Sequence, residues 1–390
     1  MTLYKKKICF VTSSRAEYGM IKNLLFQIKK SKKLNLKILA TGTHLSARHG
    51  LTYKEILQDD LQIYKKLKIS INSDTSLAIS RAISEGVKKF SKEFNSLRPD
   101  LILILGDRFE IFSAAIAAMS ERIPIAHIHG GELTEGAIDD AMRHSITKMS
   151  HLHFVAAKEY KNRVHQLGES KKFIYLVGGM GADIIKNMKF INKNELQKKL
   201  KFIFRKKNIF VNFHPVTLEK NSSRKHIKEI LKALKLLKKV GIIFSMPNAD
   251  HNSKIIYDEI NSFVKKNKNS IAFKSLGSLK YLSCLKLCNV VLGNSSSGLL
   301  EAPNLKIPTI NIGDRQKGRA KSGSVVDCLP TQKKIYLNLT SILSGKKKFK
   351  NKDFFSPYGQ GGASKKILKI LEKVNYKNLL KKKFINIVRT

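Results

Sequence analysis

The feature that most constrains the fold is a recurring run of apolar residues that ends in a polar loop and is followed by a helical pattern. In RPDLILILGDRFE (98–110), five apolar residues stand between a Pro turn and a Gly-Asp pair, and an Ala-rich helical segment (111–120) comes next. A strand that is apolar at every position has both faces covered, as in a parallel sheet between two layers of helices. The pattern predicts an α/β fold with parallel sheets.

The unit recurs in two series along the chain. Strands, some with the loops that follow them, are expected at 7–12, 34–42, 101–105, 123–129, 152–157 and 172–179, and then at 208–215, 240–248, 270–275, 289–298 and 306–313. The Lys-rich stretch 186–208 separates the two series. We therefore predict domains at 1–182 and 183–362, followed by 363–390, which holds a helix (363–375) and a peripheral basic tail (376–390). Two doubly wound domains present ligand sites at the carboxyl ends of their strands, facing a cleft between them.

The charge balance is unusual for such a fold. Lys plus Arg minus Asp plus Glu is 74 − 29 = +45, a balance that raises nucleic acid or an anionic membrane as partners. Arg, the side chain suited to bidentate phosphate and base recognition, supplies only 13 of the 74 cations. In fifty-residue blocks, only 101–150 is acidic, with 4 basic against 7 acidic residues. We therefore expect solvated Lys surfaces, and neither a nucleic-acid nor a membrane partner.

Three features of the sequence indicate the cellular compartment, and they agree with one another. The polar, basic start and the short apolar run ICFV do not form a signal peptide. No stretch approaches the ~18 apolar residues that a membrane span needs. The four Cys residues are too irregularly spaced for a disulfide framework. We expect a cytoplasmic, reduced protein.

The acidic block holds the first candidate site. GDRFE places Asp107 and Arg108 directly after the apolar strand 101–105. HIHGGELTEGAIDDAMRH (127–144) then supplies eight ionisable residues in eighteen positions: His127, His129, Glu132, Glu135, Asp139, Asp140, Arg143 and His144. Carboxylates gathered at adjacent strand ends raise one another's pKa values, which provides an acid and a base near neutral pH.

Metal binding is the alternative for the histidines. His127 and His129, like His151 and His153, stand two apart on strand-like stretches, so each pair shares a face. Paired His with carboxylates can bind zinc. The spacing matches no closed site and no Cys lies nearby, so we expect no metal.

The second series carries the pattern of an anion site. GNSSSGLLE (293–301) closes a strand and opens a helix, so that Ser295 and Ser296 offer hydroxyls and amides to a phosphate. Glu301 is placed to accept sugar hydroxyls. Arg315, in the loop after the next strand, supplies a cation for the same diphosphate.

Four further candidates follow strand ends. NFHP places His214 before a Pro, and PNAD places Asn248 and Asp250 after the following strand. Arg15 lies in SSRAEYG (13–19), at a strand-to-helix turn where an anion can meet helix amides. The loop lacks G-x-G-x-x-G, which argues against a dinucleotide cofactor.

Six motifs, in this order, carry a resemblance to a known family: SSRAEYG, LGDRFEIF, HIHGGE with RHSITKMS, NFHPVT, GNSSSGLLEAP and INIGDRQKGR. Together they closely resemble the hydrolysing UDP-N-acetylglucosamine 2-epimerases of bacterial sialic acid and related nonulosonate pathways, over about residues 5–330. The resemblance implies the GT-B architecture, with two Rossmann-like domains facing a nucleotide-sugar cleft, a small-molecule nucleotide sugar as the partner, and a homodimer as a family expectation.

The resemblance also implies a reaction. UDP leaves the sugar as the C2 proton is abstracted, which gives a 2-acetamidoglucal, and water then adds to release N-acetylmannosamine. Neither a nicotinamide nor an obligatory metal is implied. Asp107 and Asp139 match the family's acid/base carboxylates, and the positions that match UDP-binding residues are Arg15, His214, Asn248, Ser295, Ser296, Glu301 and Arg315. We add Arg108 and Asp250 to the substrate site because they stand at the same strand ends.

The chain departs from the family pattern at one catalytic position. Many members carry a Glu at this position, in the motif HIEGGE. This chain has His129 there, and a subgroup of the family with the motif HIHGGE also has His. Either His129 takes over that proton transfer or Glu132 reaches the sugar, and we expect a shared role. The alignment of Asp139 requires a one-residue insertion, so Asp140 is an alternative to it.

Three other functions remain as alternatives. Within the family, the substrate could instead be nucleotide-linked N,N'-diacetylbacillosamine, on the legionaminate pathway. A GT-B glycosyltransferase would use the same nucleotide cleft but would require an acceptor. A nucleic-acid-binding protein rests on charge alone and predicts strongly salt-dependent binding.

Overall fold

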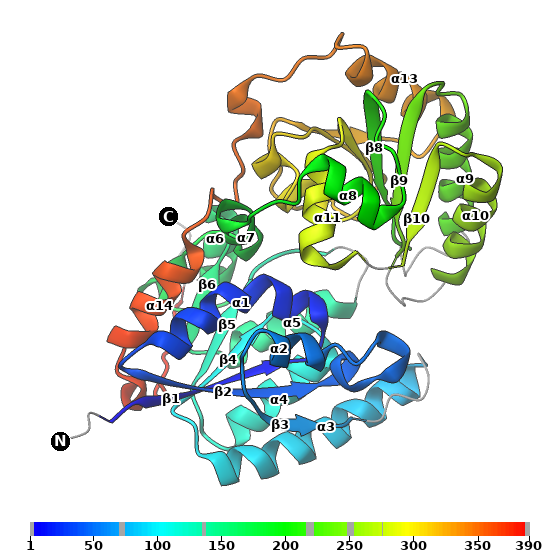
Figure 1. The fold of residues 1–390 in the computed structure, drawn as a ribbon. Helices are drawn as coiled ribbons and strands as arrows, with labels where there is room; N and C mark the ends of the chain where they lie inside the picture. The colour runs from blue at the N-terminus through cyan, green and yellow to red at the C-terminus, as the bar shows by residue number, and fades with distance from the viewer. Residues whose placement is uncertain are drawn as a thin grey trace. The chain divides into compact units, whose positions relative to one another are not determined.

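The computed structural model describes residues 4–69, 75–134, 138–215, 222–247, 253–274 and 276–386. The chain divides into two compact units (Figure 1). The first unit comprises Met1–Glu132, Ile138–Ile184 and Gly361–Thr390, and the second comprises Leu133–Ala137 and Ile185–Gln360.

In the part of the chain that is described, the first unit has a seven-stranded sheet with the order β3-β2-β1-β4-β5-β6-β7. Its strands are β1 (Lys6–Thr12), β2 (Leu34–Thr41), β3 (Ile63–Leu67), β4 (Leu101–Leu105), β5 (Ile125–Ile128), β6 (Leu152–Val155) and β7 (Ile174–Leu176). Its helices are α1 (Arg15–Lys30), α2 (Tyr53–Gln58), α3 (Ser76–Leu97), α4 (Phe109–Ser120), α5 (Ile138–Met149), α6 (Lys158–Gln166) and α14 (Ala363–Lys373), while α7 (Met180–Asn187) crosses from the first unit into the second.

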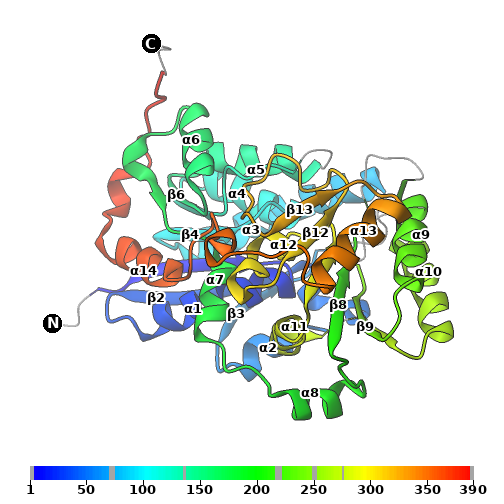
Figure 2. The same ribbon diagram turned by 90° about the horizontal axis from the view of Figure 1, so that it is seen from above.

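Helices cover both faces of this sheet. Ile8 and Phe10 of β1 pack with α1 and α14 in one core, and Cys9 and Val11 pack with α3 and α4 in another. Successive residues of a strand point to opposite faces, so a continuously apolar strand supplies both cores. Helix α14 lies beside α1 in both views (Figures 1 and 2), although more than 330 residues separate them in the chain.

The return of the chain to the first unit is fixed by one buried carboxylate. Asp183 accepts hydrogen bonds at the start of α14 from the N–H groups of Gly362, Ala363 and Ser364. Beyond α14, Tyr376 and Leu379 are both 5% exposed. The expectation that the tail is peripheral is wrong for these residues, because their apolar side chains complete the core around α1.

The second unit has a six-stranded sheet, again counting the described residues, with the order β10-β9-β8-β11-β12-β13. Its strands are β8 (Lys207–Asn212), β9 (Val240–Ser245), β10 (Ser270–Phe273), β11 (Val290–Gly293), β12 (Thr309–Ile312) and β13 (Val325–Cys328). Its helices are α8 (Lys193–Leu200), α9 (Ser222–Lys235), α10 (Ser253–Lys266), α11 (Gly277–Lys286), α12 (Ser297–Leu300) and α13 (Gln332–Leu343). Helices α9, α10 and α13 share one apolar core with the sheet.

Both sheets confirm the predicted fold class. Every strand pair is parallel, and the second sheet repeats the order of the first six strands of the first sheet. This is the Rossmann order, in which strands are added first on one side of the first strand and then on the other. Ligands bind at the carboxyl ends of the strands near the point where the order reverses. The two Rossmann-like units are those of a GT-B fold. The switch points lie between β1 and β4 and between β8 and β11.

The sequence patterns missed several elements. Strand β3 (IYKKL) has three exposed residues in its middle, and β13 (VVDC) has only one buried residue. Both are edge strands with little apolar signal. Helix α8 lies inside the Lys-rich stretch 186–208, where the sequence predicts the boundary between the two domains and no helix. Its short apolar stripe, Leu196 and Leu200, is outnumbered by Lys.

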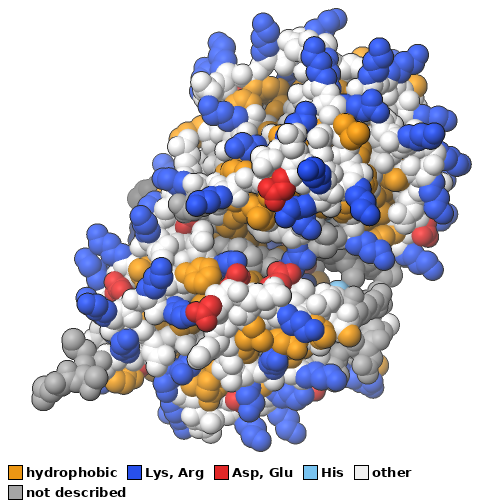
Figure 3. Space-filling model, viewed as in Figure 1, with side chains coloured by type: hydrophobic (Ala, Val, Ile, Leu, Met, Phe, Trp, Pro, Cys, Tyr) orange, Lys and Arg blue, Asp and Glu red, His pale blue; other side chains and the backbone are white. Residues whose placement is uncertain are grey.

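The basic residues do not gather into one patch on the face seen in Figure 3, where Lys and Arg side chains are scattered over both units. This distribution fits the interpretation of solvated Lys surfaces. No helix among the described residues is long and apolar enough to cross a membrane.

Candidate functional site

Asp107 stands at the carboxyl end of β4, where Gly106 turns the chain with φ of +83°. Its Oδ2 accepts a hydrogen bond from Nη2 of Arg143, a residue of α5 that is only 3% exposed. Nη1 of the same guanidinium donates to the backbone oxygen of Glu132 at 3.0 Å and to Asp140 Oδ1 at 3.1 Å. Arg143 therefore joins the loops after β4 and β5 to α5.

The charge of Arg143 is secured by its neighbours. Burial opposes the charged form, but the carboxylates of Asp107, Glu132 and Asp140 outweigh it and raise the pKa of Arg143. The sequence pattern includes Arg143 in the cluster of ionisable residues but does not predict it as a site residue. Its signal was the presence of one cation amid several carboxylates, and only the fold shows that it binds two of them, Asp107 and Asp140, and the backbone of Glu132.

His129 and Glu132 form a buried pair after β5. His129 has φ of +67°, its Nδ1 lies 3.2 Å from Glu132 Oε1, and its Nε2 accepts a hydrogen bond from the N–H of Met180 at 3.3 Å. A neutral imidazole carries one N–H, so the tautomer assigned by these contacts has its proton on Nδ1, facing Glu132. His129 therefore lies beside the Glu132 carboxylate and caps the first residue of α7.

Arg108 is held by two carboxylates between β4 and α4. Its Nε and Nη2 donate to Oε2 and Oε1 of Glu110 at 3.1 and 3.2 Å, and its Nε lies 3.9 Å from Glu17 Oε1. Burial opposes the charged form, but Glu110, Glu17 and Asp139 together raise the pKa of Arg108. Asp139, which is half-buried at the start of α5, therefore acts electrostatically on the same guanidinium.

Glu17 is a site residue that the sequence analysis missed. It lies in the first turn of α1, 5% exposed, and accepts hydrogen bonds from the N–H and the hydroxyl of Ser13 at 2.7 and 2.8 Å. Burial raises its pKa to about 7, although Arg108 acts to lower it. Its place in SSRAEYG was the signal. Arg15, two residues earlier, has its Nε 3.4 Å from Glu55 Oε1.

The histidines of β5 and β6 form hydrogen bonds to protein groups. His127 Nε2 lies 2.8 Å from the backbone oxygen of Gly106, its Nδ1 lies 3.1 Å from Thr147 Oγ1, and burial lowers its pKa to about 3. Its neighbour across the sheet, His153, has Nε2 3.2 Å from Glu169 Oε2. Within the described residues, no group of three or more His, Cys, Asp or Glu is placed to hold a metal ion.

In the second unit, the loops after β8 and β11 are fastened together. The side chain of Asn294 donates from Nδ2 to the backbone oxygen of His214 at 2.8 Å and accepts the His214 N–H at 2.7 Å. Gly293 has φ of +144°, and a Cβ there would lie 2.0 Å from the backbone oxygen of Asn212. Only glycine permits this close approach.

The serine loop continues from this junction. Ser295 and Ser296 are half-buried, and Ser296 precedes the first residue of α12. Ser297, 8% exposed, accepts a hydrogen bond from the hydroxyl of Tyr281 at 2.7 Å. Burial, followed by the charge of Glu301, raises the pKa of Tyr281. Glu301 therefore lies near the buried polar end of this loop.

Arg315 completes the second cluster. Its Nη1 and the Nε2 of Gln316 both donate to the backbone oxygen of Asn294, at 3.1 and 2.8 Å. Burial and the nearby Arg315 lower the pKa of His214 to about 3, so its ring is neutral at physiological pH. The second unit thus presents a neutral His, a cation and two Ser residues at the carboxyl ends of β8, β11 and β12.

The structure brings most predicted site residues into these clusters. The first holds Asp107, Arg108, His129, Glu132 and Asp139, and the second holds His214, Ser295, Ser296, Glu301 and Arg315. Arg15 is the first residue of α1, which follows the carboxyl end of β1, and Glu17 lies in the same helical turn. Asn248, Asp250 and Glu135 lie outside the described residues.

Comparison with known proteins agrees with the fold and the motifs. The profile of the family described as UDP-N-acetylglucosamine 2-epimerase matches residues 27–372. GDP/UDP-N,N'-diacetylbacillosamine 2-epimerase (hydrolyzing) of Campylobacter jejuni is 45% identical over 324 residues, which are 83% of this chain and 84% of that protein. Polysialic acid biosynthesis protein P7 of Escherichia coli is 40% identical over 343 residues, which are 88% of this chain and 87% of that protein.

Among solved structures, UDP-GlcNAc 2-epimerase from Neisseria meningitidis bound to UDP-GlcNAc superposes with a TM-score of 0.80. It is 18% identical, and the match covers 94% of this chain and all of that one. At this identity the structural likeness establishes the fold, while the sequence matches establish the family. The chain belongs to the UDP-N-acetylglucosamine 2-epimerase family, and within it resembles the hydrolysing members.

Proposed function

We propose that the protein is a hydrolysing nucleotide-sugar 2-epimerase. It releases the nucleoside diphosphate and a free 2-acetamido sugar whose configuration at C2 is inverted. The observation that carries the proposal is the buried Arg143 at the carboxyl ends of β4 and β5, which binds Asp107, Asp140 and the backbone of Glu132. Carboxylates gathered at adjacent strand ends support the proposal, because the reaction needs both a proton acceptor and a proton donor.

In the first step, a carboxylate removes the C2 proton as the bond between C1 and the diphosphate oxygen breaks. The products are the nucleoside diphosphate and a 2-acetamidoglucal. We assign the proton abstraction to Asp107, whose Oδ2 is held by Arg143 so that the carboxylate keeps one orientation. Positioning of a base in this way contributes about 10²- to 10⁴-fold to a proton transfer.

In the second step, water adds across the double bond: its oxygen joins C1, and a proton is delivered to C2 on the opposite face. The overall reaction consumes one water. We assign this step to Glu132, oriented by His129, together with Asp139, with Asp140 as the alternative to Asp139. Burial of the His129–Glu132 pair supports a shared proton-transfer unit.

The departing diphosphate needs cations and hydroxyls where negative charge develops. We assign this role to Arg315, His214, Ser295 and Ser296 of the second unit. Asn294 supports the assignment, because its hydrogen bonds fix the loops that carry His214 and Arg315. The remaining predicted substrate-binding residues keep their proposed roles: Arg15, Arg108, Asn248, Asp250 and Glu301.

The substrate we favour is nucleotide-linked N,N'-diacetylbacillosamine. The name of the Campylobacter jejuni relative, at 45% identity, supports this choice over the UDP-N-acetylglucosamine expected first from the motifs. UDP-N-acetylglucosamine remains the second candidate, because the 40% identical relative is named for polysialic acid biosynthesis, and N-acetylmannosamine is the sugar that the family resemblance implies for that pathway. Both reactions fit a cytoplasmic enzyme of nonulosonate synthesis.

The test incubates the enzyme, without any acceptor, with UDP-N-acetylglucosamine, UDP-diacetylbacillosamine or GDP-diacetylbacillosamine in deuterated water. NMR and mass spectrometry then follow the free sugar. We expect a free C2-inverted sugar with deuterium at C2, formed fastest from a diacetylbacillosamine nucleotide. Free sugar without deuterium would contradict the C2 chemistry, and no free sugar from any of the three would end the proposal.

A further inference from the structure

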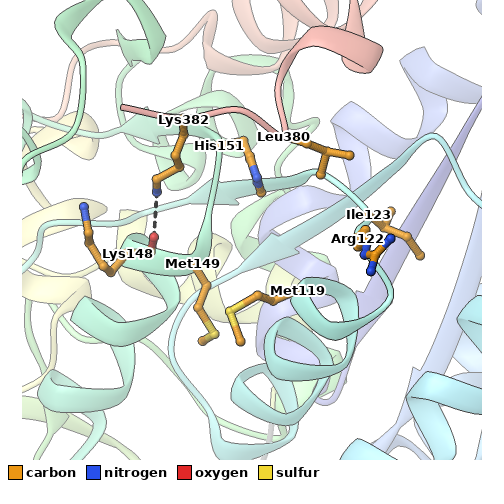
Figure 4. A pocket seen from close by; sticks show the side chains of 8 residues that line it. All are labelled: Met119, Arg122, Ile123, Lys148, Met149, His151, Leu380 and Lys382. Atoms are coloured by element: carbon orange, nitrogen blue, oxygen red, sulfur yellow. Dashed lines mark hydrogen bonds between the residues drawn. The ribbon is translucent and has the colours of Figure 1, made fainter. Parts of the chain in front are cut away.

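The C-terminal tail brings Lys382 to the end of α5. This end of the helix lies near the amino ends of the strands, whereas Asp107 lies at the carboxyl end of β4. Lys382 Nζ donates to the backbone oxygens of Lys148 and Ser150 at 2.6 and 2.7 Å, and the first of these bonds is drawn in Figure 4. The last carbonyls of a helix have no partner within the helix and carry its negative end. Lys382 therefore caps α5 with a charge of the favourable sign.

A buried carboxylate ties this cap to the sheet. Glu169, 4% exposed, lies 2.9 Å from Lys382 Nζ, 2.7 Å from Lys148 Nζ and 3.2 Å from His153 Nε2. Burial acts to raise the pKa of Glu169, but the hydrogen bonds from these three side chains lower it to about 2. The Glu169 carboxylate is therefore ionised at physiological pH. Burial lowers the pKa of Lys382, while Glu169 acts to raise it. Lys382 and Glu169, together with the groups that they bind, form a clamp on the end of α5.

The tail is held on both sides of Lys382. Ile385 donates its N–H to the backbone oxygen of Gly168 at 2.9 Å, and the ring of Phe384 lies 4.5 Å from the ammonium of Lys148. Upstream, Leu379 is buried in the core around α1. These contacts keep Lys382 in place against α5.

The clamped helix is the one that carries the proposed catalytic machinery. Arg143 lies six residues before Met149, the last residue of α5, which is about 9 Å along a helix. One turn after Arg143, and next to Lys148, Thr147 Oγ1 lies 3.1 Å from Nδ1 of His127. A shift of the helix along its axis would move the Arg143 guanidinium away from Asp107.

We propose that Lys382 is a positioning residue for the epimerase reaction, acting by seating the end of α5 so that Arg143 stays bonded to Asp107. The proposal rests on the proposed function of those two residues. Because the groups assigned to the diphosphate lie on the second unit, loss of the clamp should slow turnover without weakening UDP binding.

The test compares three full-length variants. Lys382→Met removes the charge and the donors but keeps the length of the side chain, Lys382→Arg restores a donor, and Lys383→Met is the matched control at the exposed neighbouring position. With the nucleotide sugar that the wild type turns over, we expect Lys382→Met to lose about tenfold or more in kcat, with KM and the Kd for UDP within about twofold. Lys382→Arg should recover part of the loss, and Lys383→Met should match the wild type.

Hydrogen exchange supplies a readout that does not depend on turnover. Amides of α5 should exchange faster in Lys382→Met than in Lys383→Met. Unchanged exchange, or unchanged kcat despite faster exchange, would overturn the positioning role. If the wild type turned over no nucleotide sugar, the proposed function would fail, while the exchange comparison would still decide whether Lys382 seats α5. If Lys382→Met failed to fold, Glu169→Gln would replace it, since that variant weakens the clamp and should give the same two results.

Discussion

Glu17 offers the sharpest quantitative test, because its ionisation is predicted to be coupled to folding. The carboxyl group is buried, receives two hydrogen bonds from Ser13 and lies near the Arg108–Glu110 pair. Glu17→Gln is a matched replacement: its amide can accept the N–H of Ser13 and donate to the Ser13 hydroxyl, as the protonated carboxyl would. The variant therefore mimics neutral Glu17 at every pH.

The size of the effect follows from the pKa of Glu17. Folding raises it from 4.5 to about 7, so between these values the folded protein binds the proton and the unfolded chain does not. The free energy of unfolding must then fall as pH rises through this window. A difference of about 2.5 in pKa, at about 1.4 kcal/mol each, amounts to about 3 kcal/mol.

The assay is urea unfolding of the wild type and Glu17→Gln at a series of pH values. Titration of the groups that do not interact with Glu17 cancels when the two free energies of unfolding are subtracted. The wild type should lose about 3 kcal/mol relative to the variant from about pH 4 to about pH 8, with most of the change between about pH 5 and 7. A difference that stays flat across this range would show that Glu17 ionises with an ordinary pKa, and the reasoning from its burial would be wrong.

Three further outcomes are expected. Asp107→Asn should lower kcat by about 10²- to 10⁴-fold while the Kd for UDP, measured by calorimetry, stays within about twofold; wild-type turnover would end its assignment as the base. Gly293→Ala should lower the free energy of unfolding by about 3 kcal/mol or more, because the new Cβ would lie 2.0 Å from the backbone oxygen of Asn212. Gly345→Ala, at a left-handed position with no atom within 4 Å, is its control and should cost about 1 kcal/mol. Replacing Ser295 with Ala should weaken UDP binding by about tenfold, the value of one hydrogen bond to a charged group, and an unchanged Kd would exclude its hydroxyl from the diphosphate site.

Lys382 of the basic tail and the other Lys residues of the surface have different structural roles. Most Lys residues are solvated and scattered over the surface, as Figure 3 shows for one face. Lys382 differs because it meets two helix-end carbonyls and a buried carboxylate. A count of charges does not distinguish it from Lys381 or Lys383, since only the path of the folded tail brings it to α5.

The sequence by itself determined the fold class and the positions of many proposed site residues. LILIL has to be covered on both faces, as in a parallel sheet between two layers of helices, and such a sheet places the residue after each strand, including Asp107 and His214, at its carboxyl edge. Local periodicity and chain order carry this information, so it is available without coordinates. The edge strands β3 and β13 were missed because neither has a long continuous apolar run.

Only the tertiary structure decided which of these residues act together. Arg143 meets Asp107 across 36 positions of sequence, and Lys382 meets α5 across more than 230 positions. Glu17, which follows β1, meets Arg108, which follows the neighbouring strand β4. Such partners depend on how helices pack on the sheet and on where the chain returns. Hydrogen bonds, and the interactions that shift pKa values, act over a few ångströms of space. A sequence pattern shows only which residues are neighbours along the chain.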